Sequence, residues 1–336
     1  MIKACFISDN QERIDYVFPE QQKKEIRKSV ILLDTVIAKN NLEENKEQIK
    51  DVEIAFSTWE MSKLTRKELA TYFPHLKVLF YAAGSVRSFA NPFLEQGITL
   101  INASRAMAYP VAEFTLSLII QLSKGAGFAS DNYLKMGFWP SRNVTFHKYP
   151  GLYHQTKIGI LGAGKIGTTL ISYLKPFDVE ILVFDPFMSE ERAKELGVTK
   201  ASLAFIFKNA QVITNHIANN PDTIGIINYD LLKTMKSTAA LINTGRGAQI
   251  VEEDLIRAMK EEPDRYAVLD VTTVEPYPND GPLRKVKNIY ILPHIAGYAA
   301  EEVLRLSDYA ILELHKYIEN RPVDNPITLK QLKTMA

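Results

Sequence analysis

Three side chains could carry charge and protons in a reaction: Arg246, Glu275 and His294. Arg246 lies in "INTGRGAQI", Glu275 in "LDVTTVEP" and His294 in "LPHIAGY", and each stretch begins with an apolar, strand-like run. Open α/β sheets bind ligands at the carboxyl ends of their strands. A sheet built from these runs would place a cation, an anion and an imidazole at one edge. Taken singly, each residue also has a structural explanation, as a solvated arginine, an exposed glutamate or a buried histidine.

Together these residue types suit hydride transfer to a ketone. A histidine can give a proton to the forming alkoxide, and a neighbouring carboxylate would favour the protonated ring and hold its orientation. The planar fork of an arginine suits a carboxylate together with an adjacent carbonyl. The combination predicts chemistry on a 2-oxo acid, provided that the chain also binds a hydride carrier.

The stretch "KIGILGAGKIGTTLIS" (157–172) is a candidate for binding that carrier. It places Gly162, Gly164 and Gly167 between a strand-like run and a helix-like run. Gly162 would permit the tight turn, Gly164 the approach of a pyrophosphate, and Gly167 close packing of helix on sheet. The phosphates would meet free N–H groups and the positive end of the helix dipole. The alternative is a tight strand-to-helix turn that binds nothing.

Asp185 ends the next strand-like run, 21 residues after Gly164. An acid near this position accepts hydrogen bonds from the adenosine ribose in dinucleotide-binding proteins. A 2′-phosphate would be repelled by Asp185, and the following "PFMS" offers no arginine to bind it. The sequence therefore favours NAD over NADP.

The elements that must position these residues alternate between strands and helices. Such alternation predicts α/β domains with parallel sheets. In the first hundred residues the expected strands are 3–8, 52–58, 76–83 and 98–103, with a helix ended by Pro74. From Lys157 onward, six strand-like runs predict a doubly wound sheet. Helices are expected from Tyr109 to Lys124, with Pro110 in the first turn, and over 300–320, and a polar, aromatic-rich loop over 137–151.

Composition narrows the class of protein. The 336 residues predict two domains, and a net charge of +1 gives no electrostatic case for binding nucleic acid or an anionic membrane. The single Cys5 excludes an internal disulfide and a multi-cysteine metal site, and we expect it in the core. The start of the chain lacks a signal-peptide layout, and the apolar stretch 111–122 is too short to cross a bilayer. We therefore expect a cytoplasmic protein with no metal.

Several motifs in order then indicate a family: "AAGS", "PVAEFTLSLII", "GILGAGKIG", "FDP", "LINTGRG", "LDVTTVEP" and "LPHIAG". From about Ala82 to Gly297 the chain resembles the D-isomer-specific 2-hydroxyacid dehydrogenases, which include phosphoglycerate, glycerate and D-lactate dehydrogenases. The resemblance implies an α/β fold of two doubly wound parallel-sheet domains. A Rossmann NAD-binding domain (104–298) would be inserted in a flavodoxin-like substrate domain (1–103 and 299–336). It also implies NAD-dependent interconversion of a 2-oxo acid and a D-2-hydroxy acid.

The resemblance also assigns site residues. Arg246, Glu275 and His294 match the catalytic arginine, glutamate and histidine. Backbone N–H groups of Ala83, Gly84 and Ser85 would bind the substrate carboxylate, together with Arg246 and His294. Asp270 matches an acid that contacts the nicotinamide amide. The full set of expected cofactor-binding residues is Gly162, Gly164, Lys165, Ile166, Gly167, Asp185, His216, Ile217, Thr244, Gly245, Asp270 and Gly297. Residues 110–124 and 137–151 match segments that embrace a second subunit, which predicts a homodimer.

The chain departs from the family pattern in two loops. Ala218 and Asn219 replace a usual proline and threonine, and Val86 and Arg87 replace acidic residues common after Gly84. Arg87 could meet a second anionic group of the substrate, or it could be a solvated surface residue. Two other functions stay open. One is an NAD-sensing transcriptional corepressor of the same fold. The other is a formate dehydrogenase, although the related formate dehydrogenases carry glutamine at the position of Glu275, which disfavours this alternative.

Overall fold

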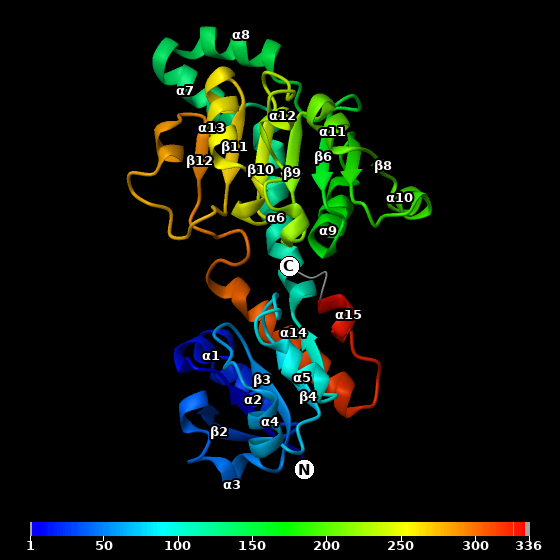
Figure 1. Ribbon diagram of the computed structural model, residues 1–336. Helices are drawn as coiled ribbons and strands as arrows, with labels where there is room; N and C mark the ends of the chain where they lie inside the picture. Colours follow the sequence, from blue (N-terminus) through cyan, green and yellow to red (C-terminus); the bar gives the residue numbers. More distant parts are fainter. Residues whose placement is uncertain (1, 325, 333–336) are drawn as a thin grey trace. The chain divides into compact units, whose positions relative to one another are not determined.

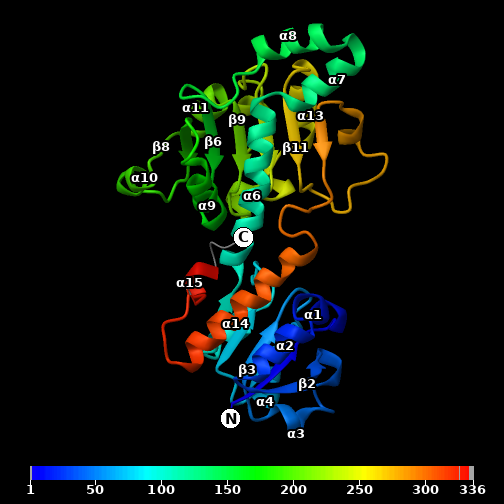
Figure 2. The ribbon, with the colours of Figure 1, turned by 180° about the vertical axis from the view of Figure 1, so that it is seen from behind.

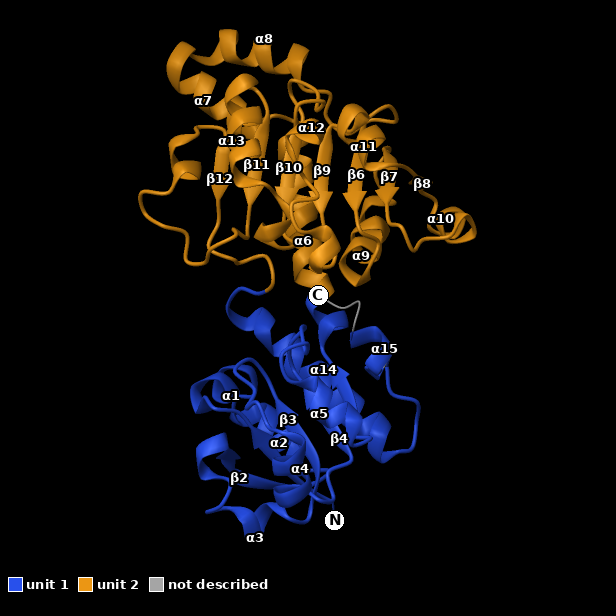
Figure 3. Cartoon of the chain, viewed as in Figure 1, with its two compact units in different colours: residues 1–107, 298–336 blue, residues 108–297 orange. Residues whose placement is uncertain are grey.

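The structure is a computed structural model that describes residues 2–324 and 326–332. The chain divides into two compact units (Figure 3). Unit 1 comprises residues 1–107 and 298–336, and unit 2 comprises residues 108–297. Unit 2 is therefore an insertion in the sequence of unit 1.

Unit 1 is a five-stranded parallel sheet with the strand order β2-β1-β3-β4-β5 (Figure 1). The strands are β1 (Lys3–Ile7), β2 (Ile31–Ile37), β3 (Val52–Ser57), β4 (Val78–Tyr81) and β5 (Thr99–Asn102). The helices are α1 (Gln11–Val17), α2 (Glu20–Arg27), α3 (Lys46–Ile49), α4 (Arg66–Tyr72), α5 (Ala90–Glu95), α14 (Leu304–Ile318) and α15 (Leu329–Leu332), with 3-10 turns η1 (Lys39–Asn41) and η5 (Ala300–Val303).

Both faces of the unit 1 sheet are buried. In β1, Ala4 and Phe6 pack with α1, α2 and α14, while Cys5 and Ile7 pack on the opposite side with α4 and α5. Successive strand residues point to opposite faces, so a doubly covered strand is apolar throughout. The four expected strands are confirmed, and Cys5 is a core residue. The prediction missed β2, an edge strand whose exposed Asp34 and Thr35 interrupt its apolar pattern.

Unit 2 is a seven-stranded parallel sheet with the order β12-β11-β10-β9-β6-β7-β8. Its strands are β6 (Lys157–Leu161), β7 (Glu180–Phe184), β8 (Thr199–Lys200), β9 (Val212–Asn215), β10 (Ala240–Asn243), β11 (Tyr266–Leu269) and β12 (Ile289–Ile291). The six expected strands are confirmed, and the two-residue β8 was missed. The strand order reverses between β6 and β9, which is the switch point of a Rossmann-type sheet.

The helices from α6 to α13 are α6 (Ser104–Ser123), α7 (Ala126–Met136), α8 (Phe138–Lys148), α9 (Lys165–Leu174), α10 (Glu190–Leu196), α11 (Leu203–Asn209), α12 (Tyr229–Leu232) and α13 (Glu252–Glu261), with 3-10 turns η2 (Pro221–Thr223), η3 (Gly247–Gln249) and η4 (Pro282–Lys285). Helices cover both faces of the unit 2 sheet. One core cluster joins the sheet to α6, α9 and α10, and the other joins it to α11, α12 and α13.

Helix α6 differs from its prediction in length. It begins at Ser104 rather than Tyr109, so Pro110 lies inside the helix and not in its first turn. The helix has 20 residues, and an 18-residue window of it has a mean hydropathy of 1.2, which is long and apolar enough to cross a membrane, so the expectation of too short an apolar stretch was wrong. However, 44% of that window is buried inside the protein, and Ala112 and Ile119 pack in the core of unit 2. Figure 2 shows α6 lying over the sheet, as a core helix does.

The expected loop over 137–151 is wrong, because most of it forms α8. Gly137 separates α7 from α8 with φ of 82°, a conformation that glycine adopts at little cost and that lets the chain reverse sharply. Pro140 lies in the first turn of α8, where its missing N–H removes no intrahelical bond. The proline and the aromatic residues of this segment are typical of a loop, which is why the sequence did not predict helix α8.

Candidate active site

The expected site residues of unit 2 all follow strands of one parallel sheet. The glycine turn follows β6, and Asp185 follows β7. His216 follows β9, Arg246 follows β10, Asp270 and Glu275 follow β11, and His294 follows β12. Because the strands are parallel, these loops share the carboxyl edge of the sheet (Figure 1). Among the described residues, no group of three or more His, Cys, Asp or Glu side chains could hold a metal ion.

The structure brings His294 and Glu275 into contact. The Nδ1 of His294 lies 2.8 Å from Oε2 of Glu275, and the two side chains are 52% and 40% exposed. The other carboxylate oxygen of Glu275 accepts the backbone N–H of Thr272 at 3.2 Å. Glu275 is thus held by its own loop and in turn orients the imidazole. With Nδ1 engaged, Nε2 is the ring nitrogen that can exchange a proton with a substrate.

Asp270 holds the backbone of the histidine loop. Its carboxylate accepts the N–H groups of Ile295 at 2.8 Å and Ala296 at 3.0 Å, and only 2% of the residue is exposed. The Asp270 carbonyl also accepts the N–H of His294 at 3.1 Å. His294 has φ of 57°, which costs energy for a residue with a side chain. The three hydrogen bonds from Asp270 stabilise this strained backbone conformation. The sequence did not suggest this structural role for Asp270.

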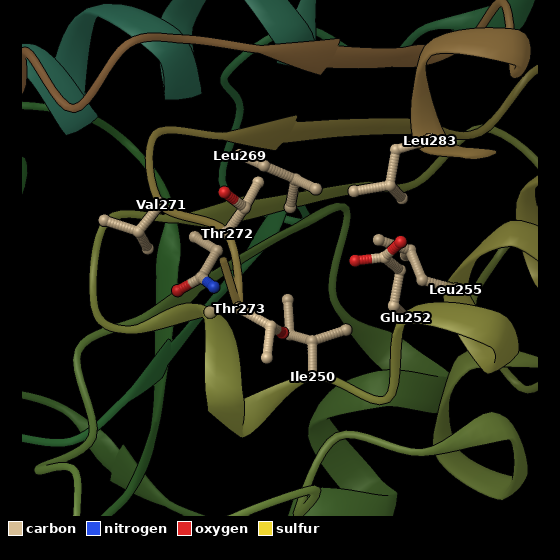
Figure 4. A pocket seen from close by; sticks show the side chains of 10 residues that line it. Ile250, Glu252, Leu255, Leu269, Val271, Thr272, Thr273 and Leu283 are labelled. Carbon is tan, nitrogen blue, oxygen red and sulfur yellow. The ribbon is translucent and has the colours of Figure 1, made fainter. Parts of the chain in front are cut away.

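Arg246 lies in a loop that packs backbone to backbone against the loop of Glu275. A Cβ on Gly247 would lie 2.0 Å from the carbonyl carbon of Thr272, so only glycine permits this approach. Thr272 and Thr273 line one pocket together with Ile250, Leu269 and Leu283 (Figure 4). The loops that carry Arg246 and Glu275 therefore cannot shift independently.

The Arg246 guanidinium itself makes a local contact. Its Nη1 donates to the carbonyl of Gly245 at 2.7 Å. Within residues 2–324 and 326–332, no hydrogen bond joins Arg246 to Glu275 or His294. A planar guanidinium carries five N–H donors, so this single bond leaves capacity for a carboxylate and a carbonyl.

The three glycines of the turn after β6 meet different surroundings. Gly162 has φ of 92°, and a Cβ there would lie 2.7 Å from the carbonyl oxygen of His216. A Cβ on Gly167 would lie 2.1 Å from the carbonyl oxygen of Gly162. A Cβ on Gly164 would meet nothing within 4 Å. Two glycines are thus required by the protein itself, and the third faces open space in which phosphates could reach the backbone.

The start of α9 fits an anionic ligand. Lys165, Ile166 and Gly167 form its first turn, and its N-cap, Gly164, makes no side-chain cap hydrogen bond. Backbone N–H groups at the start of a helix and the helix dipole favour a bound phosphate. The residues present therefore fit the pyrophosphate of a dinucleotide.

Asp185 is bonded to the same turn. One oxygen accepts the N–H of Ala163 at 2.8 Å, and the other accepts the N–H of Phe187 at 2.9 Å. Each oxygen of an ionised carboxylate has a second lone pair, so both can still accept a ribose hydroxyl. Asp185 therefore supports the glycine turn besides its expected place beside the ribose.

His216 is a neutral part of the site. Its Nε2 lies 3.0 Å from Oγ1 of Thr214, and its Nδ1 lies 3.3 Å from Oγ1 of Thr244. Burial lowers the pKa of His216 to about 3, because the protonated ring would lose its hydration. Thr244 Oγ1 also lies 3.4 Å from Oγ1 of Thr115 in α6. The imidazole therefore acts as a hydrogen-bonding group and carries no charge at neutral pH.

Sequence reasoning missed three amide side chains next to these residues. Asn215 ends β9, Asn243 ends β10, and Gln249 ends η3, and all three are fully buried. The available signal was a polar residue closing each of two apolar strands, "VITN" and "ALIN". These three side chains form hydrogen bonds with the backbone of Arg246 and of Ile217.

In unit 1, the expected substrate-binding backbone follows β4. The N–H of Ala83 donates to the carbonyl of Tyr81 at 2.8 Å, within the loop. The carbonyl of Gly84 accepts the Asn102 side chain, and a Cβ on Gly84 would lie 2.6 Å from Sδ of Met107. Ser85 is exposed. A carboxylate-binding backbone at Ala83, Gly84 and Ser85 stays a prediction.

Comparison with known proteins places the sequence in a family. Residues 116–296, more than half of the chain, match the family model of the D-isomer specific 2-hydroxyacid dehydrogenase NAD binding domain. A D-3-phosphoglycerate dehydrogenase of Synechocystis is 33% identical over 207 residues, which are 62% of this chain and 36% of that protein. A glyoxylate reductase of Thermofilum pendens is 32% identical over 248 residues, which are 72% of this chain and 71% of that protein.

The overall fold also matches a solved structure. The crystal structure of a phosphoglycerate oxidoreductase from Rhizobium etli superposes with a TM-score of 0.81 at 21% identity, covering 97% of this chain and 98% of that one. At this identity the likeness concerns the fold alone. The chain spans between 36% and 54% of the length of the phosphoglycerate dehydrogenases from Synechocystis, Archaeoglobus fulgidus and Methanocaldococcus jannaschii.

Proposed function

Because the chain belongs to the family of D-isomer specific 2-hydroxyacid dehydrogenases, we propose that it is an oxidoreductase that uses a nicotinamide dinucleotide to interconvert a 2-oxo acid and a D-2-hydroxy acid. The observation that carries the proposal is the 2.8 Å contact between His294 Nδ1 and Glu275 Oε2. It lies at the sheet edge that also holds the glycine turn and Arg246. The experiment is a screen of NADH oxidation by the purified chain over a panel of 2-oxo acids, in which no oxidation would contradict the proposal.

In this reaction Arg246, His294 and Glu275 have different roles. A reduced dinucleotide held at the glycine turn would supply the hydride, with its electron pair, for the carbonyl carbon of the substrate. Arg246 binds the carboxylate and the adjacent carbonyl oxygen, which stabilises the negative charge that develops there. His294 transfers its Nε2 proton to that oxygen, and Glu275 stabilises the protonated ring before the transfer. In oxidation His294 takes the proton back.

We propose NAD rather than NADP as the cofactor. Asp185 supports this choice, because its negative charge lies where a 2′-phosphate would approach the turn. The residues after it, Pro186 to Ser189, contain no cation. Wild-type activity with NADPH equal to that with NADH would contradict this assignment.

The substrates to test first follow from the names of the relatives. The names of those proteins indicate that one relative reduces glyoxylate and that another is a dehydrogenase of D-3-phosphoglycerate. Arg87 follows Gly84 closely and is exposed, and we propose that it favours substrates with a second anionic group. Equal activity of Arg87→Ala and the wild type on mono- and dianionic 2-oxo acids would contradict the role of Arg87.

We also propose a homodimer formed through α7 and α8. Apolar and aromatic side chains are unusually exposed there, with Leu134 81% and Trp139 71% exposed, and α7 has no buried residue. Tyr133, Phe138 and Phe146 extend this surface. A patch of this kind marks an interaction site. A monomer mass in sedimentation at micromolar concentration would contradict the dimer.

The proposed partners are otherwise small molecules, and the proposed location is the cytoplasm. A net charge of +1 does not favour nucleic acid, and the buried Cys5 suits a reducing compartment. The relatives named above are dehydrogenases and reductases, which favours an enzyme over a corepressor. Cell fractionation tests the location.

A further inference from the structure

Three fully buried amide side chains form one hydrogen-bonded group at the carboxyl edge of the unit 2 sheet. Asn215 and Asn243 are the last residues of the neighbouring strands β9 and β10 and are paired in the parallel ladder. The Nδ2 of Asn215 donates to Oδ1 of Asn243 at 3.0 Å and to Oε1 of Gln249 at 2.6 Å. Both protons of this amide are therefore used within the group.

The group holds the backbone of Arg246 from both sides. Oε1 of Gln249 accepts the N–H of Arg246 at 3.2 Å, and Nδ2 of Asn243 donates to the carbonyl of Arg246 at 3.0 Å. Oδ1 of Asn243 also accepts the N–H of Gly245 at 3.1 Å. A residue bonded through both its N–H and its carbonyl has little freedom to rotate. These amides therefore fix the backbone of Arg246, from which its side chain extends.

The same amides hold the backbone of Ile217, in the loop after β9. Oδ1 of Asn215 accepts the N–H of Ile217 at 3.3 Å, and Nε2 of Gln249 donates to its carbonyl at 2.7 Å. A Cβ on Gly245 would lie 3.0 Å from both the Asn215 and the Gln249 side chains, so the loops are closely packed around the group. Asn215 and Gln249 thus bridge the arginine loop and the loop after β9.

An amide that is buried without a hydrogen-bond partner destabilises a protein, so an apolar side chain is the simpler way to fill such a space. Here every acceptor oxygen and at least one donor proton of each amide are bonded. Polar groups that are bonded in this way fix one geometry where apolar packing tolerates several. We propose that Asn215 and Gln249 are positioning residues, which fix Arg246 through its backbone and tie it to the loop at Ile217. The catalytic consequence rests on the proposed function.

The test compares Gln249→Met with a matched control, Gln211→Met. Gln211 is a buried amide at the opposite end of β9, where its Nε2 donates to the carbonyl of Thr238 at 2.7 Å. We expect Gln249→Met to lower kcat/KM for the best 2-oxo acid by about 10- to 100-fold, since a small misplacement of a binding group has an effect of this size. Hydrogen exchange at the Arg246 amide should accelerate. The control should lose stability and keep both properties.

A double variant, Asn215→Leu with Gln249→Met, extends the test to the loop after β9. It removes both side-chain partners of the Ile217 backbone as well as the partner of the Arg246 N–H, so exchange should be fast at Arg246 and at Ile217 while kcat/KM stays low. Wild-type exchange and kcat/KM in either variant would overturn the proposal. A wild type that reduces no 2-oxo acid contradicts only the proposed function, because exchange at Arg246 still tests the amides without any substrate.

Discussion

The carboxylate of Glu275 lies 2.8 Å from the Nδ1 of His294, across two loops that leave adjacent strands. Glu275 is bonded to the N–H of Thr272, and the histidine turn is bonded to Asp270. Neither partner relies on the contact alone to reach its position. The pair is therefore organised before any ligand arrives, which is what general acid–base catalysis requires.

Replacing Glu275 with glutamine should lower the turnover of reduction. Glutamine keeps a side-chain oxygen within reach of Nδ1 of His294 but loses the charge that makes this hydrogen bond strong, so the imidazole should be held less firmly. The measurement is the steady-state rate of NADH oxidation. Titration of NADH by fluorescence provides the control and should show wild-type affinity; wild-type turnover would contradict the role of Glu275.

Replacing Arg246 with alanine should weaken both substrate binding and turnover. The guanidinium is proposed to bind the carboxylate in the ground state and the carbonyl oxygen in the transition state, so KM should rise and kcat should fall. Arg246→Lys should restore charge without the planar fork and recover only part of the activity. Steady-state kinetics of the three proteins test this. A variant with altered KM and wild-type kcat would restrict Arg246 to binding.

Two substitutions of Asp185 should separate charge from loop support. Asp185→Asn removes the negative charge and keeps a side-chain oxygen that can accept the N–H of Ala163. Asp185→Ser removes the charge, and its shorter side chain can no longer accept the N–H of Ala163. We expect both variants to use NADPH better relative to NADH, because a 2′-phosphate is no longer repelled. Only the serine variant should also bind NADH more weakly; ratios of kcat/KM for the two cofactors that match the wild type would refute the role of the charge.

The pKa of His216, lowered to about 3 by burial, predicts a pH dependence of stability. Between the ordinary value of 6.5 and about 3, the unfolded chain binds a proton at this ring that the native protein does not. Wild-type stability should therefore fall relative to His216→Gln as pH decreases from 7 to about 4. Urea unfolding of both proteins across this range measures the difference. A constant difference would show that the ring titrates equally in both states.

The conformation of the glycine turn after β6 could be predicted because its constraints are local. Gly162 needs positive φ, and Gly167 packs against the backbone of Gly162, so sequence spacing carries both requirements. The strands of both sheets were readable because strands buried on both faces form continuous apolar runs. Strand β2 was missed because its exposed Asp34 and Thr35 lie at a sheet edge.

Other features depend on contacts between distant segments. The expected loop became α8 because Gly137 supplies a reversal that the aromatic composition of the segment concealed. Asn215 and Gln249 are 34 residues apart, and their bond exists only once β9 and β10 are neighbours. The support that Asp270 gives to the histidine turn likewise spans 25 residues. No periodicity or propensity encodes such pairs.

The most direct test of the central claim is the rate of NADH-dependent reduction by His294→Ala, measured beside His75→Ala, which removes an exposed histidine of unit 1. Without the proton donor, kcat should fall by about 10²–10⁴-fold, the usual contribution of general acid–base catalysis, while NADH binding stays at the wild-type level. His75→Ala should turn over as the wild type does. Undiminished turnover by His294→Ala would contradict the assignment of His294 as the acid and base of the reaction.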